Sequence, residues 1–241
     1  MFLLSGCAGG PSPRPIPSPS TSPWEIPQAA YGSQRLYRVN YSGPEGEGSF
    51  KVTLRLAAPV RYQIQAVDPV GRSLWSLDVA NDAGISLNHR NRTYCVFEGR
   101  FELDSAPLGP FPLLALPSLL LGRVPAEPAA SVEEARPVEI AFRDAAGRRW
   151  ATIVKDGLVV SWSMAEGSAP RIWFMRRDDW AIFSDRERAV QVRWREVLRE
   201  DLDREPQRLE APAGYQQTAC GEPAPPEPEE GEEGGNSAPP I

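Results

Sequence analysis

The chain has 241 residues, which is enough for one large all-β domain or two small domains. Its net charge is −6 and its 26 Lys and Arg residues form no basic block, which argues against a nucleic-acid-binding surface. Three cysteines without zinc-ligand spacing, and one histidine, argue against a disulfide framework, a metal site and a Ser-His-Asp triad. We therefore expect no cofactor and assign no catalytic residue. The histidine, His89, falls in an Asn-rich turn and is expected to be exposed.

The first seven residues resemble the end of an export signal. Leu4-Ser5-Gly6-Cys7 resembles the lipobox of bacterial lipoproteins, in which the cysteine is acylated and becomes the mature N-terminus. The residues before Cys7 are too few for a complete signal, so we expect the natural signal to begin upstream. The resemblance implies a lipid anchor at Cys7, and Ala8 after it implies the outer membrane. The alternative interpretation is a chance tetrapeptide.

Two proline-rich segments flank the body of the chain. Residues 8–32 are a Pro/Ser-rich tether, expected to be extended because proline fixes φ and removes a hydrogen-bond donor. Residues 201–241 are a Pro/Glu-rich tail with few large apolar residues, and we expect this tail to be disordered. The folded domain is therefore expected over residues 33–200.

Alternating apolar and polar residues dominate this domain. The pattern runs from residue 34 to 97 and again from 138 to 194, with short turns between the runs. Such alternation is typical of antiparallel strands with one buried face, and we count about eleven of them. The predicted fold class is mainly β, an incomplete antiparallel β-barrel.

Phe111 to Gly122 is the most apolar segment of the body. It is much shorter than the roughly 20 residues that span a bilayer. Pro117 can begin a short helix and Gly122 can end it. Two interpretations stay open: an apolar helical lid over the concave face of the sheet, or an ordinary helix that completes the core.

Cys95 and Cys220 are the two cysteines that remain once Cys7 is acylated. Because an exported protein enters an oxidising compartment, the two can form a disulfide. Such a bridge would hold the segment from Leu209 to Cys220 against the sheet. Two unpaired thiols are the alternative.

Four parts of the body carry a family resemblance. They are Arg61-Tyr62-Gln63-Ile64 with Asp68-Pro69-Val70-Gly71, Gly84-Ile85-Ser86-Leu87 with Arg92-Thr93-Tyr94, Phe111-Pro112-Leu113 to Leu121-Gly122, and the hairpin from Trp150 to Trp162 around Asp156-Gly157. In order and spacing they resemble LolB, the outer-membrane family that receives lipoproteins from the periplasmic carrier LolA. The resemblance covers residues 34–197 and implies an incomplete barrel around an apolar cavity, closed by a helical lid.

The same resemblance implies the site residues. The turn Pro69-Val70-Gly71 would protrude, with Val70 at the position where the family carries an apolar residue used to hand the lipoprotein to the membrane. Acyl chains would occupy a cavity lined by Val52, Leu54, Leu56, Tyr62, Ile64, Trp75, Leu77, Leu113, Leu116, Leu120, Val160 and Trp162.

The implied function is that of a lipid-anchored receptor on the periplasmic face of the outer membrane of a Gram-negative bacterium. It would accept lipoproteins and aid their insertion without catalysing a reaction. Its expected partners are lipoprotein acyl chains or lipids, a LolA-like carrier, and the membrane through the anchor, but not nucleic acid. The alternative is a structural or assembly lipoprotein whose barrel is filled by its own Trp and Phe side chains. An enzyme is disfavoured by the single histidine and the lack of paired carboxylates on one strand face.

Overall fold

The computed structural model describes residues 22–44, 46–81, 83–98, 115–126, 128–129, 132–135, 138–166 and 169–220. In this part strands dominate, with one short 3-10 helix, η1 (Gln28–Ala30), and one α-helix, α1 (Leu116–Leu120). Cys7, the tether up to residue 21, Leu113 and the tail beyond residue 220 lie outside the described residues.

The first half of the described chain is a meander of six strands. They are β1 (Ser33–Gly43), β2 (Gly46–Ala58), β3 (Arg61–Val67), β4 (Ser73–Ala80), β5 (Ala83–Asn88) and β6 (Thr93–Glu98). Each strand pairs antiparallel with the next along the chain.

The second half is another antiparallel meander. Its strands are β7 (Val132–Ala135), β8 (Glu139–Arg143), β9 (Arg149–Lys155), β10 (Leu158–Glu166), β11 (Ala169–Arg177), β12 (Trp180–Asp185) and β13 (Val190–Asp201). Strand β7 pairs only with β8 among the described strands. A last strand, β14 (Gln216–Gln217), pairs parallel with β6.

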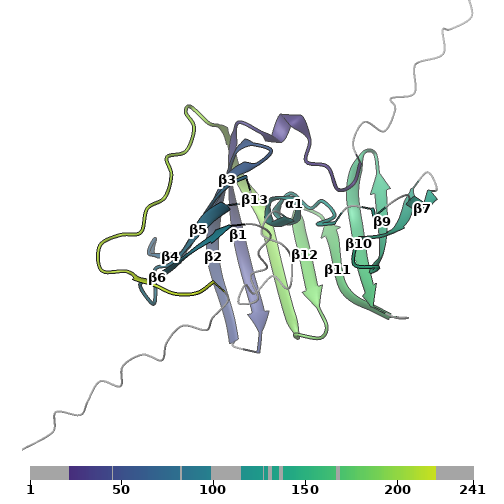
Figure 1. Ribbon diagram of the computed structural model, residues 1–241. Coiled ribbons are helices and arrows are strands. Elements are labelled where there is room, and N and C mark those ends of the chain that lie inside the picture. The colour runs from purple at the N-terminus through teal and green to yellow at the C-terminus, as the bar shows by residue number, and fades with distance from the viewer. Residues whose placement is uncertain are drawn as a thin grey trace, which may run out of the picture.

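The two meanders join where the long strands β1 and β13 pair, from Ser33 opposite Asp201 to Ser42 opposite Gln191. One sheet results, in the order β14-β6-β5-β4-β3-β2-β1-β13-β12-β11-β10-β9-β8-β7. Its edges are β14 and β7, and no strand pairing within the described residues closes them (Figure 1). The prediction of a mainly β, incomplete antiparallel barrel is confirmed.

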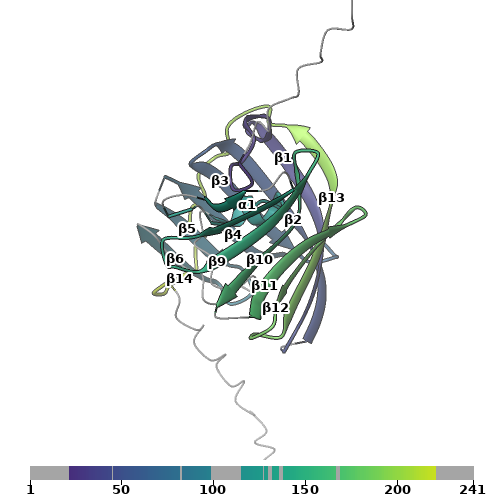
Figure 2. The ribbon, with the colours of Figure 1, turned by 90° about the vertical axis from the view of Figure 1, so that its right-hand side faces the viewer.

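The sheet curls around α1 rather than lying flat (Figure 2). Register shifts interrupt the ladders at several places, among them Leu36/Tyr37 in β1 and Val159/Ser161 in β10. Such bulges bend a strand and increase its twist, which favours curling. We call the inner side of this curl, which carries Tyr37, Leu54 and Trp194, the concave face; these three side chains are 2% exposed or less and belong to one hydrophobic cluster.

Both flanking segments differ from expectation where the structure describes them. Residues 22–32, expected to be part of an extended tether, fold against the domain: Trp24 packs edge-on against Phe142, and Pro23 accepts a hydrogen bond from Val124 N–H at 3.0 Å. Residues 202–220, expected to be disordered, run along the sheet. We call this second segment the C-terminal strap.

Candidate functional site

Helix α1 begins and ends as its sequence predicts. Pro117 occupies the first turn, where its missing N–H costs nothing. Gly122 follows the helix with a φ of 69°, in the left-handed region that favours glycine. The Arg123 N–H reaches back to the Ser118 carbonyl at 2.7 Å, which satisfies a carbonyl that the helix leaves open.

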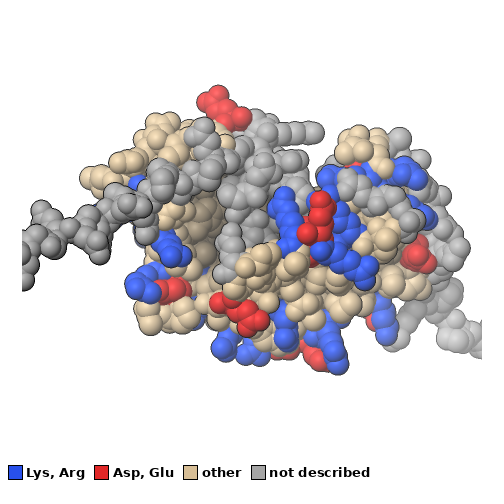
Figure 3. Space-filling view, turned by 90° about the horizontal axis from the view of Figure 1, so that it is seen from below, with Lys and Arg blue, Asp and Glu red and all other residues tan. Residues whose placement is uncertain are grey.

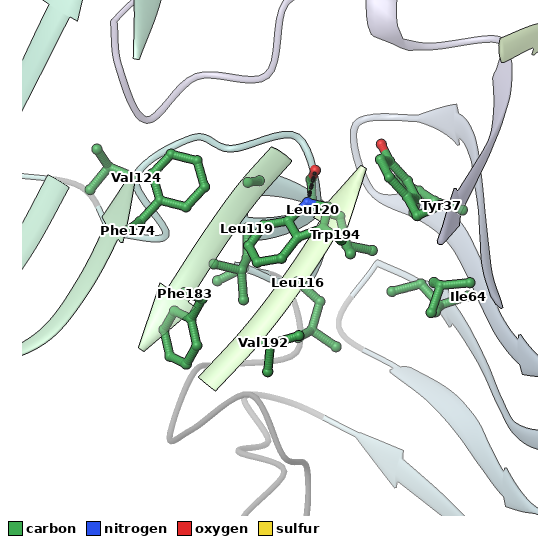
Figure 4. Packing of buried hydrophobic residues seen from close by; sticks show 14 of the residues in the cluster. Tyr37, Ile64, Leu116, Leu119, Leu120, Val124, Phe174, Phe183, Val192 and Trp194 are labelled. Carbon is green, nitrogen blue, oxygen red and sulfur yellow. Dashed lines mark hydrogen bonds between the residues drawn. The ribbon is translucent and has the colours of Figure 1, made fainter. Parts of the chain in front are cut away.

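The helix lies on the concave face with every one of its five residues buried. Leu116, Leu119 and Leu120 point toward Phe183, Val192 and Trp194 of the second meander (Figure 4). The Trp194 indole donates a hydrogen bond to the Leu120 carbonyl at 3.0 Å. Apolar contacts therefore make up most of the interface between α1 and the sheet, and such contacts have no preferred direction.

Most of the residues expected to line a cavity do lie on the concave face. Val52, Leu54, Leu56, Tyr62, Ile64, Leu77, Leu116, Leu120 and Trp162 are each 8% exposed or less. Trp75 is half-buried and packs against the same cluster.

Val160 is the exception, and its assignment to the concave face needs correction. In a regular strand every second side chain lies on the same face, so counting back from Trp162 assigns Val160 and Leu158 to the face of the tryptophan. A bulge between Val159 and Ser161 reverses that phase, so Val159 is 2% exposed and Leu158 is 60% exposed. Val160 itself is half-buried and lies outside the hydrophobic cluster.

Large aromatic side chains fill the second meander from strand to strand. Trp162 on β10 stacks on Phe174 of β11 with ring centroids 5.5 Å apart, and Trp150 on β9 lies 5.5 Å from Trp162. The row also includes Phe142 on β8 and Trp194 on β13. Cross-strand aromatic pairs of this kind stabilise a sheet, and here they occupy interior volume that a ligand would otherwise take.

The turn between β3 and β4 exposes its apolar residue to solvent. Val70 is 77% exposed, the highest value among the large hydrophobic side chains that the structure describes. Beneath it, Asp68 Oδ1 accepts the backbone N–H groups of Val70 at 3.0 Å and Arg72 at 2.8 Å. Burial alone would raise the pKa of Asp68, but the hydrogen bonds with Arg72 and Val70 lower it overall.

A second turn, between β8 and β9, repeats this arrangement. Asp144 Oδ1 accepts the N–H groups of Ala146 and Arg148, both at 3.0 Å, and Oδ2 pairs with Arg148 Nε at 2.7 Å. Trp150 Nε1 also donates to this carboxylate at 2.9 Å. The shared spacing Asp-x-x-Gly-Arg at 68–72 and 144–148 signals this equivalence, which was not predicted from the sequence.

The C-terminal strap covers the outer side of the first meander. Arg61 and Asp78 form a buried ion pair there, and Arg61 also donates to the Pro206 carbonyl at 3.1 Å. Leu209 N–H donates to Asp78 Oδ2 at 2.8 Å. A disulfide joins Cys95 on β6 to Cys220 at the end of the strap. The bridge holds the strap against the sheet, as expected for a disulfide between these two cysteines.

His89 is half-buried, which corrects the expectation of an exposed residue. One ring nitrogen lies 2.8 Å from Ser76 Oγ and the other 2.9 Å from the Tyr215 hydroxyl in the strap. Burial lowers the pKa of His89, so the neutral form that exchanges hydrogen bonds with both hydroxyls is favoured. The histidine thus helps to fasten the strap.

Charged side chains show no single block on the side seen in Figure 3, where Lys and Arg alternate with Asp and Glu. Within the described residues, no group of three or more His, Cys, Asp or Glu side chains is placed to hold a metal ion. None of the helices in the same part of the chain is long and apolar enough to cross a bilayer.

These features define an open, curled antiparallel sheet with a short apolar helix on its concave face. No family model and no curated protein sequence matches the chain. Among solved structures, it is similar to a LolA superfamily protein from Nitrosomonas europaea, with 8% identity, 76% of this chain and 90% of that chain covered, and a TM-score of 0.46.

Two further structures give similar values. One is a DUF1329 family protein from Desulfovibrio piger, with 8% identity, coverage of 70% and 85%, and a TM-score of 0.46. The other is a putative outer membrane lipoprotein-sorting protein domain from Vibrio parahaemolyticus, with 5% identity, coverage of 73% and 87%, and a TM-score of 0.44. Values this low do not assign the chain to a family.

Proposed function

We propose that this protein binds acyl chains on the concave face of its sheet, as a lipid-anchored receptor for lipoproteins or lipids in the bacterial envelope. Cys7 would carry the anchor, on the periplasmic face of the outer membrane, and a LolA-like carrier would deliver the cargo. The protein would exchange apolar contacts with the cargo and catalyse no reaction.

One observation carries this proposal: α1 is a small apolar element seated on a large apolar face. Leu116, Leu119 and Leu120 contact the sheet through side chains that an acyl chain can replace, because dispersion and burial are not directional. The side-chain hydrogen bond from Trp194 ends on a backbone carbonyl of the helix, so a ligand that replaces only the leucine side chains leaves this bond in place.

A second candidate function has its own support. The aromatic row from Phe142 through Trp150, Trp162 and Phe174 to Trp194 packs the second meander with the protein's own side chains. A filled interior suits a structural or assembly lipoprotein of the envelope that binds through its outer surface and holds no ligand.

Native mass spectrometry separates the two candidates. The full chain carrying Cys7→Ser, so that it is not acylated itself, would be purified from cells under mild conditions. The receptor predicts extra mass corresponding to bound acyl species, which dissociates on collisional activation. A homogeneous unliganded protein that takes up no added long-chain lipid would support the assembly role instead.

A further inference from the structure

Just after α1, the chain enters a group of arginine side chains. Apolar packing does not explain why charged side chains gather there. We call Arg35, Arg123 and Arg176, with Tyr37, the arginine cluster. Arg176 on β11 donates from Nη2 to the Leu121 carbonyl at 2.7 Å and from Nε to the Val159 carbonyl at 3.1 Å. Its guanidinium therefore lies against the end of the helix.

Gly122 shows how tightly Arg176 is seated. A Cβ built on this glycine would meet an atom of the Arg176 guanidinium and an atom of the Phe174 ring, both closer than real Cβ contacts. The glycine thus makes room for the arginine, and Arg123 follows it immediately in the chain. The Arg123 side chain lies close enough to Arg176 to be affected by its charge, which lowers the pKa of Arg123.

Arg123 is buried without a partner. It is 8% exposed, and no side-chain hydrogen bond or ion pair joins it to any residue that the structure describes. Burial lowers the pKa of Arg123, Arg176 lowers it further, and Glu25 opposes both effects. An arginine stays charged in proteins, so this site holds a largely buried cation whose carboxylate neighbour, Glu25, forms no ion pair with it in the described structure.

The carboxylate nearby is already engaged. Glu196 pairs with Arg35 at 2.8 Å, and no carboxylate forms an ion pair with Arg176 within the described residues. Arg176 Nη1 likewise makes no hydrogen bond to a described residue, and because the side chain is exposed, its two N–H groups are open to solvent and to an anion that arrives from it.

Tyr37 adds an unsatisfied polar group. Its side chain is 2% exposed, and its hydroxyl lies beside Arg35 without forming a hydrogen bond of normal geometry. Burial raises the pKa of Tyr37, so the hydroxyl stays protonated and can donate. Buried hydroxyls are normally hydrogen-bonded, so this one indicates an acceptor that is not part of the described chain.

We propose that the arginine cluster binds an oxyanion, a phosphate or carboxylate group, at the head of an acyl ligand. Arg123 and Arg176 would bind the charge, and the Tyr37 hydroxyl would donate one more hydrogen bond. The chain of the ligand would then run along the concave face beside α1. The inference rests on the proposed function and adds the ligand's polarity and orientation to it.

Calorimetric titration of the full chain carrying Cys7→Ser tests this, below the critical micelle concentration of each probe. The probes are dodecyl phosphate, dodecyl maltoside and inorganic phosphate. We expect dodecyl phosphate to bind at least about tenfold more tightly than dodecyl maltoside, as charge-assisted hydrogen bonds imply. In Arg123→Gln this preference should disappear. The matched control, Arg90→Gln, changes the same charge in the exposed β5–β6 turn and should keep the preference.

Each other outcome is decisive. If the protein with an intact arginine cluster binds the two dodecyl compounds equally tightly, the oxyanion site is overturned and the acyl-binding function stays in place. Failure of all three probes to bind would overturn both proposals. Retention of the preference in Arg123→Gln would overturn the assignment to this cluster. Binding of inorganic phosphate alone, lost in Arg123→Gln, would support the site and identify a free anion as its ligand.

Stability gives an independent readout. Because Arg123 has no partner in the described structure, Arg123→Gln should leave the thermal midpoint unchanged or raise it. A clear fall in the midpoint of the unliganded protein would show that the arginine is structural, and would contradict the proposal.

Discussion

At the scale of single residues, two aspartates organise the turns that begin β4 and β9. In each turn one carboxylate oxygen accepts two backbone N–H groups, and the other pairs with an arginine four residues later. The turn conformation is thereby fixed by side-chain chemistry and not by packing, which leaves the tip of the first turn free to present Val70 to solvent.

Asp144→Asn should destabilise the fold by about 1–3 kcal/mol, because the amide nitrogen cannot accept from Arg148 and Trp150. Burial would raise the pKa of Asp144, but the hydrogen bonds from Trp150 and Arg148 lower it below the ordinary value of 3.8. The stabilisation is therefore complete above that value and is lost as the pH falls through the lowered pKa.

Urea unfolding between pH 3 and pH 7 checks this prediction. The variant should lose less stability on acidification than the wild type does, because its amide does not titrate. Asp156→Asn is the control: Asp156 is exposed in another turn with a φ of 52°, which asparagine also tolerates, so its stability should not change. Equal pH dependence of the wild type and Asp144→Asn would contradict the account.

Val70→Glu should slow the delivery of bound acyl cargo to lipid vesicles and leave the thermal midpoint unchanged, since the side chain is 77% exposed. A charge at this tip would oppose its entry into the membrane interface. Transfer of a fluorescent fatty acid to vesicles measures the rate. Val60→Glu, at an exposed valine of the β2–β3 turn, is the matched control. If both variants deliver at the wild-type rate, Val70 is only a turn residue.

Periodicity predicted the concave residues on β2, β3 and β4 but placed Val160 wrongly on β10. The alternation of Leu158, Val160, Trp162 and Met164 looks continuous in sequence. The bulge that interrupts it depends on pairing with β9, which no local pattern encodes. The arginine cluster escaped the sequence analysis for a similar reason, because β1, β11 and the end of α1 meet only in the folded chain.

At the scale of elements, the C-terminal strap is the part that composition predicted least well. Its residues are polar and lack any period, as in a disordered tail. They are held by hydrogen bonds to backbone and side-chain groups on the sheet, such as Gln216 N–H to the Arg92 carbonyl at 2.9 Å and Thr218 N–H to the Tyr94 carbonyl at 2.9 Å. The strap also pairs with β6, which would otherwise be an open edge.

Cys220→Ser should lower the free energy of unfolding by about 2–5 kcal/mol, because the Cys95–Cys220 bridge closes a long loop of 125 residues. The strap should also become accessible to trypsin at Arg204 and Arg208. Reduced wild-type protein should behave like the variant, and a reductant should not affect the variant further. A strap that stays resistant to trypsin after reduction would show that hydrogen bonds alone hold it.

At the scale of the whole molecule, the two meanders differ in how their concave sides are filled. The first is lined by aliphatic residues such as Leu54, Ile64 and Leu77, and the second by the aromatic row that ends at Trp194. Helix α1 belongs to the segment that crosses from β6 to β7 between them. An acyl chain that displaces apolar contacts of α1 would therefore meet the tryptophans of the second meander.

Brominated acyl chains test this central claim most directly, because bromine quenches tryptophan fluorescence on contact. Of the tryptophans described, Trp150, Trp162 and Trp194 are each 2% exposed or less on the concave face. Titration with a brominated fatty acid should quench their emission, an unbrominated analogue should reverse the effect, and Trp194→Phe should weaken it. If the brominated chain leaves the emission unchanged while the protein stays folded, the concave face is a packed core and not an acyl-binding site.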